Sequence, residues 1–401
     1  AVVDLRQNGT AEAKVRQVYR ENPPALSTSC SLGPVLSAAA GKRTTQMEVQ
    51  PQVLDTIDLA VKYVGVVLDV LLQRWRMRNL PPLQDAGDFC RMGTTVLVTG
   101  PTSGIGTATA AEFARRGCHV VLACRSLSRG KKLQQQIELY AKEAGVSEPN
   151  IEVMELDLAS LESVNKFCDN WESKAAPIDV LVNNAGVFAM GAPRSVTCDG
   201  LELHLGTNYM SCFLLTMRLL PFLRQAGESM HTKCAMGEAR IVMVASKLHE
   251  IGAINTKDPQ LLSHYSPAVA YGQSKLAQVM FTAELRRRIP ASWNVGCYSL
   301  HPGNVLTEVV RTLPLLVQWA YRIVMRLMLL TTSEGARATL YVSTSCAVEP
   351  SAHASNGYFD SDCKAKKPSS FATDKSMARW LWRFSSRIVK LPEKYQLKET
   401  D

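Results

Sequence analysis

Tyr271 and Lys275 lie four residues apart in the segment Ala270-Tyr-Gly-Gln-Ser-Lys275. The segment continues with a helical pattern of apolar residues, so both side chains are expected on one helix face. An ammonium group beside a phenol favours the phenolate, which brings proton transfer by the tyrosine toward neutral pH. We therefore predict that Tyr271 is a general acid or base at a substrate oxygen.

Two further polar residues complete the predicted catalytic set. Ser246 follows the apolar run Ile-Val-Met-Val-Ala at 241–245 and is expected to hydrogen-bond to the same substrate oxygen. Asn208, on an earlier predicted helix, is expected to position Lys275 through a water molecule. Each residue type is common, and an isolated tyrosine and lysine at this spacing also occur in ordinary helices. The prediction therefore depends on their position after a phosphate-binding segment.

That segment is the glycine-rich turn Thr99-Gly-Pro-Thr-Ser-Gly-Ile-Gly106, which precedes a helical pattern. Glycine lets the backbone approach a pyrophosphate closely, and a helix N-terminus offers free N–H groups to an anion. Tight turns also use glycine, but a strand before the turn and a helix after it are the context that a dinucleotide requires. The loop residues predicted to bind the cofactor are Gly100, Thr102, Ser103, Gly104, Ile105 and Gly106.

The end of the second predicted strand, Ala123-Cys-Arg125, indicates which dinucleotide is expected. An acidic residue at this point would hydrogen-bond to the ribose hydroxyls of NAD, whereas Arg125 supplies a cation for a 2′-phosphate. The sequence thus favours NADP(H) over NAD(H), with a solvated surface arginine as the alternative. Asp157 and Leu158, just after the third predicted strand, are expected beside the adenine.

Six short apolar runs must position these side chains. They lie at 95–99, 119–123, 151–154, 179–182, 241–244 and 295–299, and helical patterns separate them. Nearly continuous apolar strands predict a sheet covered on both faces, and helical crossovers require parallel strands with right-handed connections. The predicted fold class is α/β, a doubly wound parallel sheet of the Rossmann type, with an N-terminal helical extension.

The extension contains one strong helical segment, residues 53–78, between Pro51 and the pair Pro81-Pro82. Its charges fall on one narrow stripe and the rest of its circumference is apolar. It has no run of 18 uncharged apolar residues, so we expect it in a membrane interface or packed on protein.

We therefore predict three parts of the chain. They are an extension at 1–92, a Rossmann-type domain at 93–392 that includes a C-terminal helix, and a tail at 393–401. Residues 22–47 contain no acidic side chain and are expected to be either the remnant of an organellar presequence or a flexible extension.

In order along the chain, these motifs resemble the short-chain dehydrogenase/reductase family, and within it the retinol dehydrogenase-like branch. The family motifs are Thr99-Gly-x-x-x-Gly104-x-Gly106, Asn183-Asn184-Ala185-Gly186, Asn208, Ser246, Tyr271-x-x-x-Lys275 and His301-Pro302-Gly303. Similarity to the branch rests on Ala123-Cys124-Arg125, Tyr271-Gly-Gln-Ser-Lys-Leu-Ala277 and Ser299-Leu-His-Pro-Gly303.

The resemblance covers residues 93 to about 392 and implies additional cofactor contacts. It implies that Lys275 binds the nicotinamide ribose beside Tyr271. The other residues that it places near the cofactor are Asn184, Ala185, Gly186, Pro302, Gly303 and Thr307. Four features depart from the family pattern without touching the catalytic residues: Pro101, Met243, Ala245 and the segment 205–207.

Residues 312–330 are long and apolar, and the resemblance places such a segment over the substrate pocket. It is expected either to rest on a bilayer surface, with its two arginines reaching the headgroups, or to be a lid buried on its own domain. A basic amphipathic helix is predicted near residues 376–390. Its arginines form one stripe, and Met377, Trp380, Phe384 and Ile388 form another, which indicates docking by the apolar face rather than nucleic-acid binding.

Composition limits the remaining classes. The chain has 401 residues, 46% of them hydrophobic, which excludes a disordered protein, and most of its net charge of +9 lies in residues 311–401. Eleven cysteines occur without a Cys-x-x-Cys pair or histidines at metal spacing, so we predict no metal site and a reducing compartment. We expect a membrane surface or a membrane-protein partner, at a mitochondrion or the endoplasmic reticulum.

The predicted function is an NADP(H)-dependent oxidoreductase that interconverts a hydrophobic alcohol and its aldehyde or ketone. The expected substrate is a small retinoid, steroid or isoprenoid-like molecule. The alternative is an accessory subunit of an organellar membrane complex that retains the dehydrogenase fold with little or no catalysis. The sequence leaves the oligomeric state open.

Overall fold

The computed structural model describes residues 65, 68–77, 80, 93–189, 191–233, 237–305, 329–348 and 356–399. Seven strands form one parallel sheet in the order β3-β2-β1-β4-β5-β6-β7. The strands are β1 (Thr95–Thr99), β2 (His119–Cys124), β3 (Ile151–Glu155), β4 (Val180–Asn183), β5 (Ala239–Val244), β6 (Val295–Leu300) and β7 (Tyr358–Phe359). The predicted doubly wound parallel sheet is confirmed.

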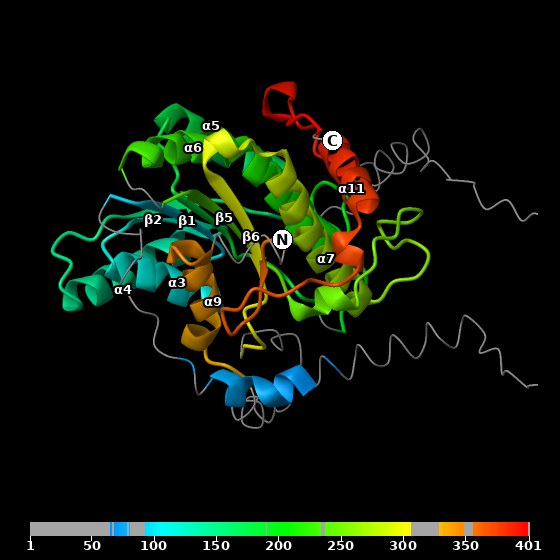
Figure 1. The fold of residues 1–401 in the computed structure, drawn as a ribbon, viewed down its shortest axis with the longest axis horizontal. Coiled ribbons are helices and arrows are strands. Elements are labelled where there is room, and N and C mark those ends of the chain that lie inside the picture. Colours follow the sequence, from blue (N-terminus) through cyan, green and yellow to red (C-terminus); the bar gives the residue numbers. More distant parts are fainter. Residues whose placement is uncertain are drawn as a thin grey trace, which may run out of the picture.

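The α-helices cover both faces of this sheet, as Figure 1 shows. Helices α3 (Gly104–Arg115), α4 (Leu127–Glu143) and α9 (Thr332–Thr344) lie on one face. On the other face lie α5 (Leu161–Lys174), α6 (Ser211–Lys233) and α7 (Pro267–Arg288), with α11 (Lys375–Ile388) packed on α7. Each face has its own apolar core, because the strands bury side chains in both directions.

Shorter helical turns connect these elements. They are η1 (Leu205–Met210), η2 (Lys247–Glu250), η3 (Ala291–Trp293), η5 (Phe371–Thr373) and η6 (Glu393–Tyr395). The η1 turn is a π-helix that continues directly into α6, a wide turn of the kind often found at functional sites. The η6 turn lies within the predicted tail, yet Tyr395 is buried there against Arg218.

The C-terminal helix α11 docks by an apolar face that includes the predicted stripe and is wider than it. Phe384 of the stripe is buried, and Met377, Trp380 and Ile388 are partly buried against the core. Ala378, Leu381 and Trp382 are buried beside them. Trp382 fits against Phe213 of α6, with ring centroids 5.4 Å apart. The large indole lies on the inner side of the helix, and its burial widens the docked face.

The described part of the N-terminal extension is a helix at residues 68–77, drawn in blue beside α9 in Figure 1. It agrees with the C-terminal half of the predicted helix at 53–78; the first half, and residues 22–47, lie outside the described residues. Its polar side faces the domain, with Asp69 and Gln73 buried. Its exposed residues are the apolar Leu68, Leu71, Leu72 and Trp75.

Candidate active site

A cleft of about 560 Å³ opens at the carboxyl ends of the central strands. Most of the predicted cofactor and catalytic residues line it: Gly100, Thr102, Ser103, Gly104, Ile105, Arg125, Asp157, Leu158, Asn184, Ala185, Gly186, Ser246, Tyr271, Lys275, Pro302 and Gly303. Gly106 and Asn208 lie behind the walls of the cleft. Thr307 and most of the predicted segment 312–330 lie outside the described residues.

One end of the cleft is the N-terminus of α3. The N-cap residue Ser103 makes no side-chain capping bond, whereas the N-caps of α4 and α9 accept bonds from their own first turns. A Cβ at Gly106 would lie 2.5 Å from the carbonyl oxygen of Gly100, so glycine is required for this tight turn. Uncapped N–H groups behind a close glycine turn fit a dinucleotide pyrophosphate.

Pro101 is compatible with this loop although it removes one N–H donor. Its carbonyl oxygen accepts a hydrogen bond of 2.6 Å from the Thr107 hydroxyl, which ties the turn to the first helical turn. On the opposite wall, the Asn184 amide donates to the Thr99 carbonyl at 2.9 Å. The Thr99 hydroxyl accepts the N–H groups of Asn184 and Ala185, a role that the sequence analysis missed.

Basic side chains gather beyond the phosphate loop. Arg125 is exposed at the end of β2 and lines the cleft together with Ser126 and Arg129. The Arg129 guanidinium donates to the Thr102 carbonyl at 3.1 Å, so it is held beside the loop. The Asp157 carboxylate accepts the N–H of Ala159 at 3.0 Å, which uses one of its oxygens for the local turn.

At the other end of the cleft, α7 presents Tyr271 and Lys275 on one face, as their spacing predicts. Burial raises the pKa of Tyr271 to about 12, and a hydrogen bond with Ser246 acts in the opposite direction. Burial lowers the pKa of Lys275 to about 8. The Lys275 Nζ lies 5.5 Å from the centre of the Tyr271 ring, close enough for its charge to favour the phenolate.

Gln278 links Lys275 to Asn208, where the sequence analysis expected a water molecule. The Lys275 ammonium donates to the Val244 carbonyl at 2.9 Å and to the Gln278 side-chain oxygen at 3.0 Å. The Gln278 amide in turn donates to the carbonyl oxygen of Asn208 at 2.6 Å. The signal was present in the sequence, because Gln278 lies three residues after Lys275 on the same helix.

The side chain of Asn208 makes direct hydrogen bonds to the backbone, and its predicted water-mediated contact with Lys275 stays a prediction. Within η1 it accepts the N–H of Val187 at 2.7 Å and donates to the Val187 carbonyl at 3.0 Å. It thereby fixes the loop that follows β4, near Val187. The neighbouring Phe188 stacks on Tyr271 with ring centroids 4.4 Å apart, a contact that no sequence pattern indicated.

We expect Gln278→Glu to shift the pH dependence of the carbonyl reduction that the sequence predicts. A carboxylate in place of the amide favours the charged form of Lys275, so its pKa rises and the loss of kcat/KM above about pH 8 moves to higher pH. Gln278→Leu removes the acceptor and moves the loss to lower pH. The measurement is kcat/KM against pH, with Gln135→Glu, at an exposed glutamine of α4, as the control. Identical profiles for all variants would show that Gln278 does not act on Lys275.

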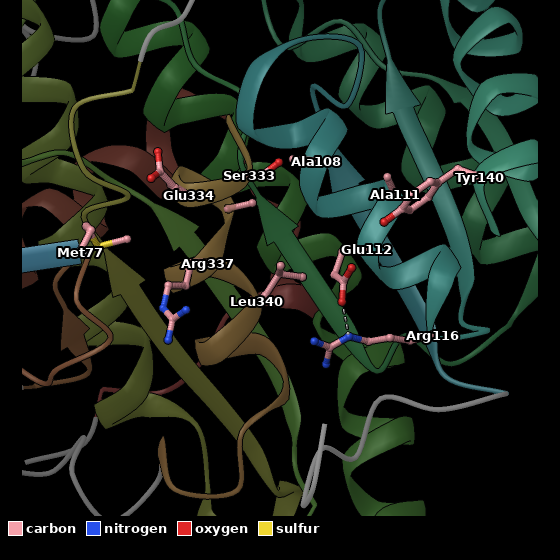
Figure 2. A pocket seen from close by; sticks show the side chains of 11 residues that line it. Met77, Ala108, Ala111, Glu112, Arg116, Tyr140, Ser333, Glu334, Arg337 and Leu340 are labelled. Atoms are coloured by element: carbon pink, nitrogen blue, oxygen red, sulfur yellow. Dashed lines mark hydrogen bonds and ion pairs between the residues drawn. The ribbon is translucent and has the colours of Figure 1, made fainter. Parts of the chain in front are cut away.

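A second hollow, of about 640 Å³, lies between α3 and α9 (Figure 2). Its polar side chains include Glu112, which is paired with Arg116, while Ala108, Ala111 and Leu340 supply apolar surface. None of the predicted catalytic residues lines it. Within the described ranges, no group of histidine, cysteine, aspartate and glutamate is arranged to hold a metal ion. The residues that could do chemistry therefore meet in the first cleft.

Comparisons with known proteins agree with this geometry. A family model described as short chain dehydrogenase matches residues 94–315. Mouse retinol dehydrogenase 14 is 38% identical over 314 residues, which cover 76% of this chain and 89% of that relative. An Arabidopsis thaliana protein named dehydrogenase/reductase SDR family member FEY is 33% identical over 339 residues, covering 81% of this chain and 85% of that protein.

Solved structures show the same fold. An uncharacterised protein from Mycobacterium paratuberculosis matches with a TM-score of 0.56 at 31% identity, covering 78% of this chain and 97% of that one. L-sorbose reductase from Gluconobacter frateurii, complexed with NADPH and L-sorbose, matches with a TM-score of 0.52 at 21% identity, covering 70% and 98%. At this lower identity the likeness concerns the fold alone.

Proposed function

Because this chain belongs to the retinol dehydrogenase-like branch of the short-chain dehydrogenase/reductase family, we propose that it interconverts a hydrophobic alcohol and its carbonyl with NADP(H). One observation carries the proposal. Ser246, Tyr271 and Lys275 line the same cleft as the uncapped N-terminus of α3. A cofactor seated on that terminus would reach the three side chains along one continuous cleft.

The bound cofactor supplies or accepts hydride, and the side chains donate or accept the proton at the substrate oxygen. In reduction, the Tyr271 hydroxyl donates its proton to that oxygen, and in oxidation the phenolate accepts the proton. The Ser246 hydroxyl donates a hydrogen bond to the same oxygen. Lys275 remains charged below about pH 8 and stabilises the phenolate, while Val244 and Gln278 hold its ammonium in place.

The proposed preference for the 2′-phosphorylated cofactor rests on the basic group at the end of β2. Arg125 and Arg129 lie on the cleft with the Ser126 hydroxyl between them in sequence. A phosphate gains charge-assisted hydrogen bonds from two guanidinium groups, whereas the unphosphorylated ribose does not. No carboxylate from residues 123–129 competes for the ribose.

A hydrophobic substrate is proposed from the surroundings of Tyr271. Val187, Phe188 and Leu248 line the cleft there, so the carbon skeleton next to the substrate oxygen would contact apolar side chains. Small apolar substrates gain affinity from such walls, and the polar Ser246 and Tyr271 fix their orientation. A retinoid, steroid or isoprenoid-like alcohol fits this chemistry, and the names of relatives such as mouse retinol dehydrogenase 14 point the same way.

The decisive experiment is a screen of lipid aldehydes, ketones and alcohols with the purified full chain, NADPH and NADP⁺. We expect turnover of at least one long-chain or polycyclic carbonyl, followed as NADPH absorbance. Absence of turnover across the series, together with migration of the native protein in a large detergent-solubilised complex, would instead support the accessory-subunit alternative. Turnover of hydrophilic sugars alone would overturn the proposed substrate class.

Attachment to a membrane surface is proposed from the helix at 68–77. Leu68, Leu71, Leu72 and Trp75 are 49–68% exposed, although the same helix buries its polar side against the domain. A helix that contacts the protein through its polar side and exposes its apolar side is suited to bind a lipid surface. Among the described residues, no helix combines the length and hydropathy needed to cross a bilayer.

We expect Leu71→Ser combined with Leu72→Ser to weaken binding to liposomes by at least about tenfold, because each buried leucine contributes roughly 1.5–3 kcal/mol. Strong salt should not release the wild-type chain, since apolar burial is not screened. The measurement is co-sedimentation with vesicles that contain anionic lipid. Leu139→Ser, at an exposed leucine of α4, is the matched control. Equal binding by both variants would refute attachment through this helix.

A further inference from the structure

The helix at 68–77 contacts the chain segment that follows β6, residues 301–305. This segment contains the His301-Pro302-Gly303 motif and borders the cleft beside Tyr271 and Lys275. Val70 of the helix lines the same cleft. The matched family model begins at residue 94, so these contacts come from a part of the chain that the family model does not include.

Gln73 makes the central contact. Its side chain is fully buried and pairs with the backbone of Asn304 in both directions. The Asn304 N–H donates to the Gln73 side-chain oxygen at 2.7 Å, and the Gln73 amide donates to the Asn304 carbonyl at 3.0 Å. A side-chain amide thus pairs with both backbone groups of a half-buried loop residue, as a neighbouring strand would.

Asp69, one helical turn earlier, contacts the same loop. Its carboxylate pairs with Arg76, accepts the Asn304 side-chain amide at 3.2 Å, and lies 3.5 Å from the His301 Nε2. Burial alone would raise the pKa of Asp69, but the nearby His301 imidazole and the paired Arg76 guanidinium outweigh it and lower that pKa. Asp69 is therefore a carboxylate at neutral pH, facing the imidazole of the motif.

His301 extends this contact to the catalytic serine. Its Nδ1 accepts the backbone N–H of Lys247 at 3.2 Å, and Lys247 directly follows Ser246. A neutral imidazole that accepts at Nδ1 carries its proton on Nε2, the atom that faces Asp69. The His301 side chain thus links Asp69 of the helix to the backbone beside Ser246.

The loop has little freedom to settle elsewhere. Gly303 adopts φ +87°, and a Cβ there would lie 2.5 Å from Leu330 and 3.4 Å from the Gln73 side-chain oxygen. The same helix also contacts residues 329–330, because the Arg74 guanidinium donates to the Leu329 carbonyl at 3.0 Å. The Leu330 N–H donates to the Asn304 carbonyl at 2.9 Å, so the helix, the loop and residues 329–330 all contact one another around Asn304.

We propose that Gln73 and Asp69 are positioning residues of the cofactor site, which hold the His301–Asn304 loop against the nicotinamide end of the cleft. The inference rests on the proposed function, because it assigns the helix to the same NADP(H) site. Without Gln73, the Asn304 N–H loses its partner and the Asn304 carbonyl keeps only the Leu330 N–H, so the loop shifts toward water. The N-terminal helix then supports cofactor binding in addition to providing a surface for membrane attachment.

The test is Gln73→Met in the full chain, which keeps the size of the side chain and removes both hydrogen bonds. We expect the Kd for NADPH to rise about tenfold, which corresponds to about 1.4 kcal/mol, with kcat lowered and the thermal midpoint nearly unchanged. NADH should weaken by the same factor, because Arg125 and the 2′-phosphate site are untouched. The matched control is Gln134→Met on α4, where one side-chain bond to the Ile151 carbonyl is lost far from the loop.

Asp69→Asn is the second variant and serves alone if Gln73→Met does not fold. It preserves shape but removes the charge that faces His301, and we expect a smaller rise in both dissociation constants. Unchanged dissociation constants and kcat in the folded variants would overturn the inference while leaving the proposed function intact. Failure of the wild-type chain to bind either dinucleotide would instead overturn the proposed function itself.

Discussion

Replacement of Tyr271 by phenylalanine is expected to lower kcat by about 10²–10⁴-fold, the usual contribution of a positioned general acid or base. The hydroxyl is lost while the ring remains stacked on Phe188, so the cleft keeps its shape. NADPH binding should change little, because the hydroxyl acts chiefly in the chemical step. The measurements are single-turnover reduction of a carbonyl found in the screen and NADPH binding by fluorescence titration.

Tyr140→Phe is the control for that experiment, since Tyr140 is an exposed tyrosine of α4 at the second hollow. Its removal should leave turnover unchanged. Retained turnover in Tyr271→Phe would mean that another group transfers the proton, and the catalytic assignment would fail. Loss of NADPH binding together with turnover would indicate collapse of the cleft and would also contradict the predicted result.

The sheet could be predicted from the sequence because its strands are fully covered. The run at 95–99 matches β1, and the other predicted runs lie within two residues of their strands. β7 was missed as a strand because Tyr358 and Phe359 form only two residues, too few to show a period. The order of motifs indicated that Tyr271 and Lys275 serve the site of the glycine turn, and both line the same cleft as that turn.

Side-chain partners were less predictable than elements. The bridge from Lys275 through Gln278 to the Asn208 backbone depends on the π-helical turn η1, whose wide geometry has no simple sequence signature. The sequence also left undecided which face of the helix at 68–77 contacts the domain. Its polar stripe finds partners in a loop more than 200 residues away. Hydrophobic periodicity identifies an amphipathic helix but not which face meets protein.

Arg125→Asp is expected to reverse the cofactor preference, changing the ratio of the NADPH and NADH dissociation constants by about 10²-fold. Hydrogen bonds to a charged group contribute about 1.5–3 kcal/mol each, and the new carboxylate would both repel the 2′-phosphate and accept the ribose hydroxyls of NAD. Because Arg125 is exposed, salt should narrow the proposed preference of the wild-type protein for NADPH over NADH. Both constants are measured by titration at low and high salt, with Arg383→Asp, at an exposed arginine of α11, as the control. Equal affinity for the two cofactors, in the wild type and in the variant alike, would show that Arg125 is an ordinary surface arginine. Asp157 would then be the next residue to test as a contact of the adenosine.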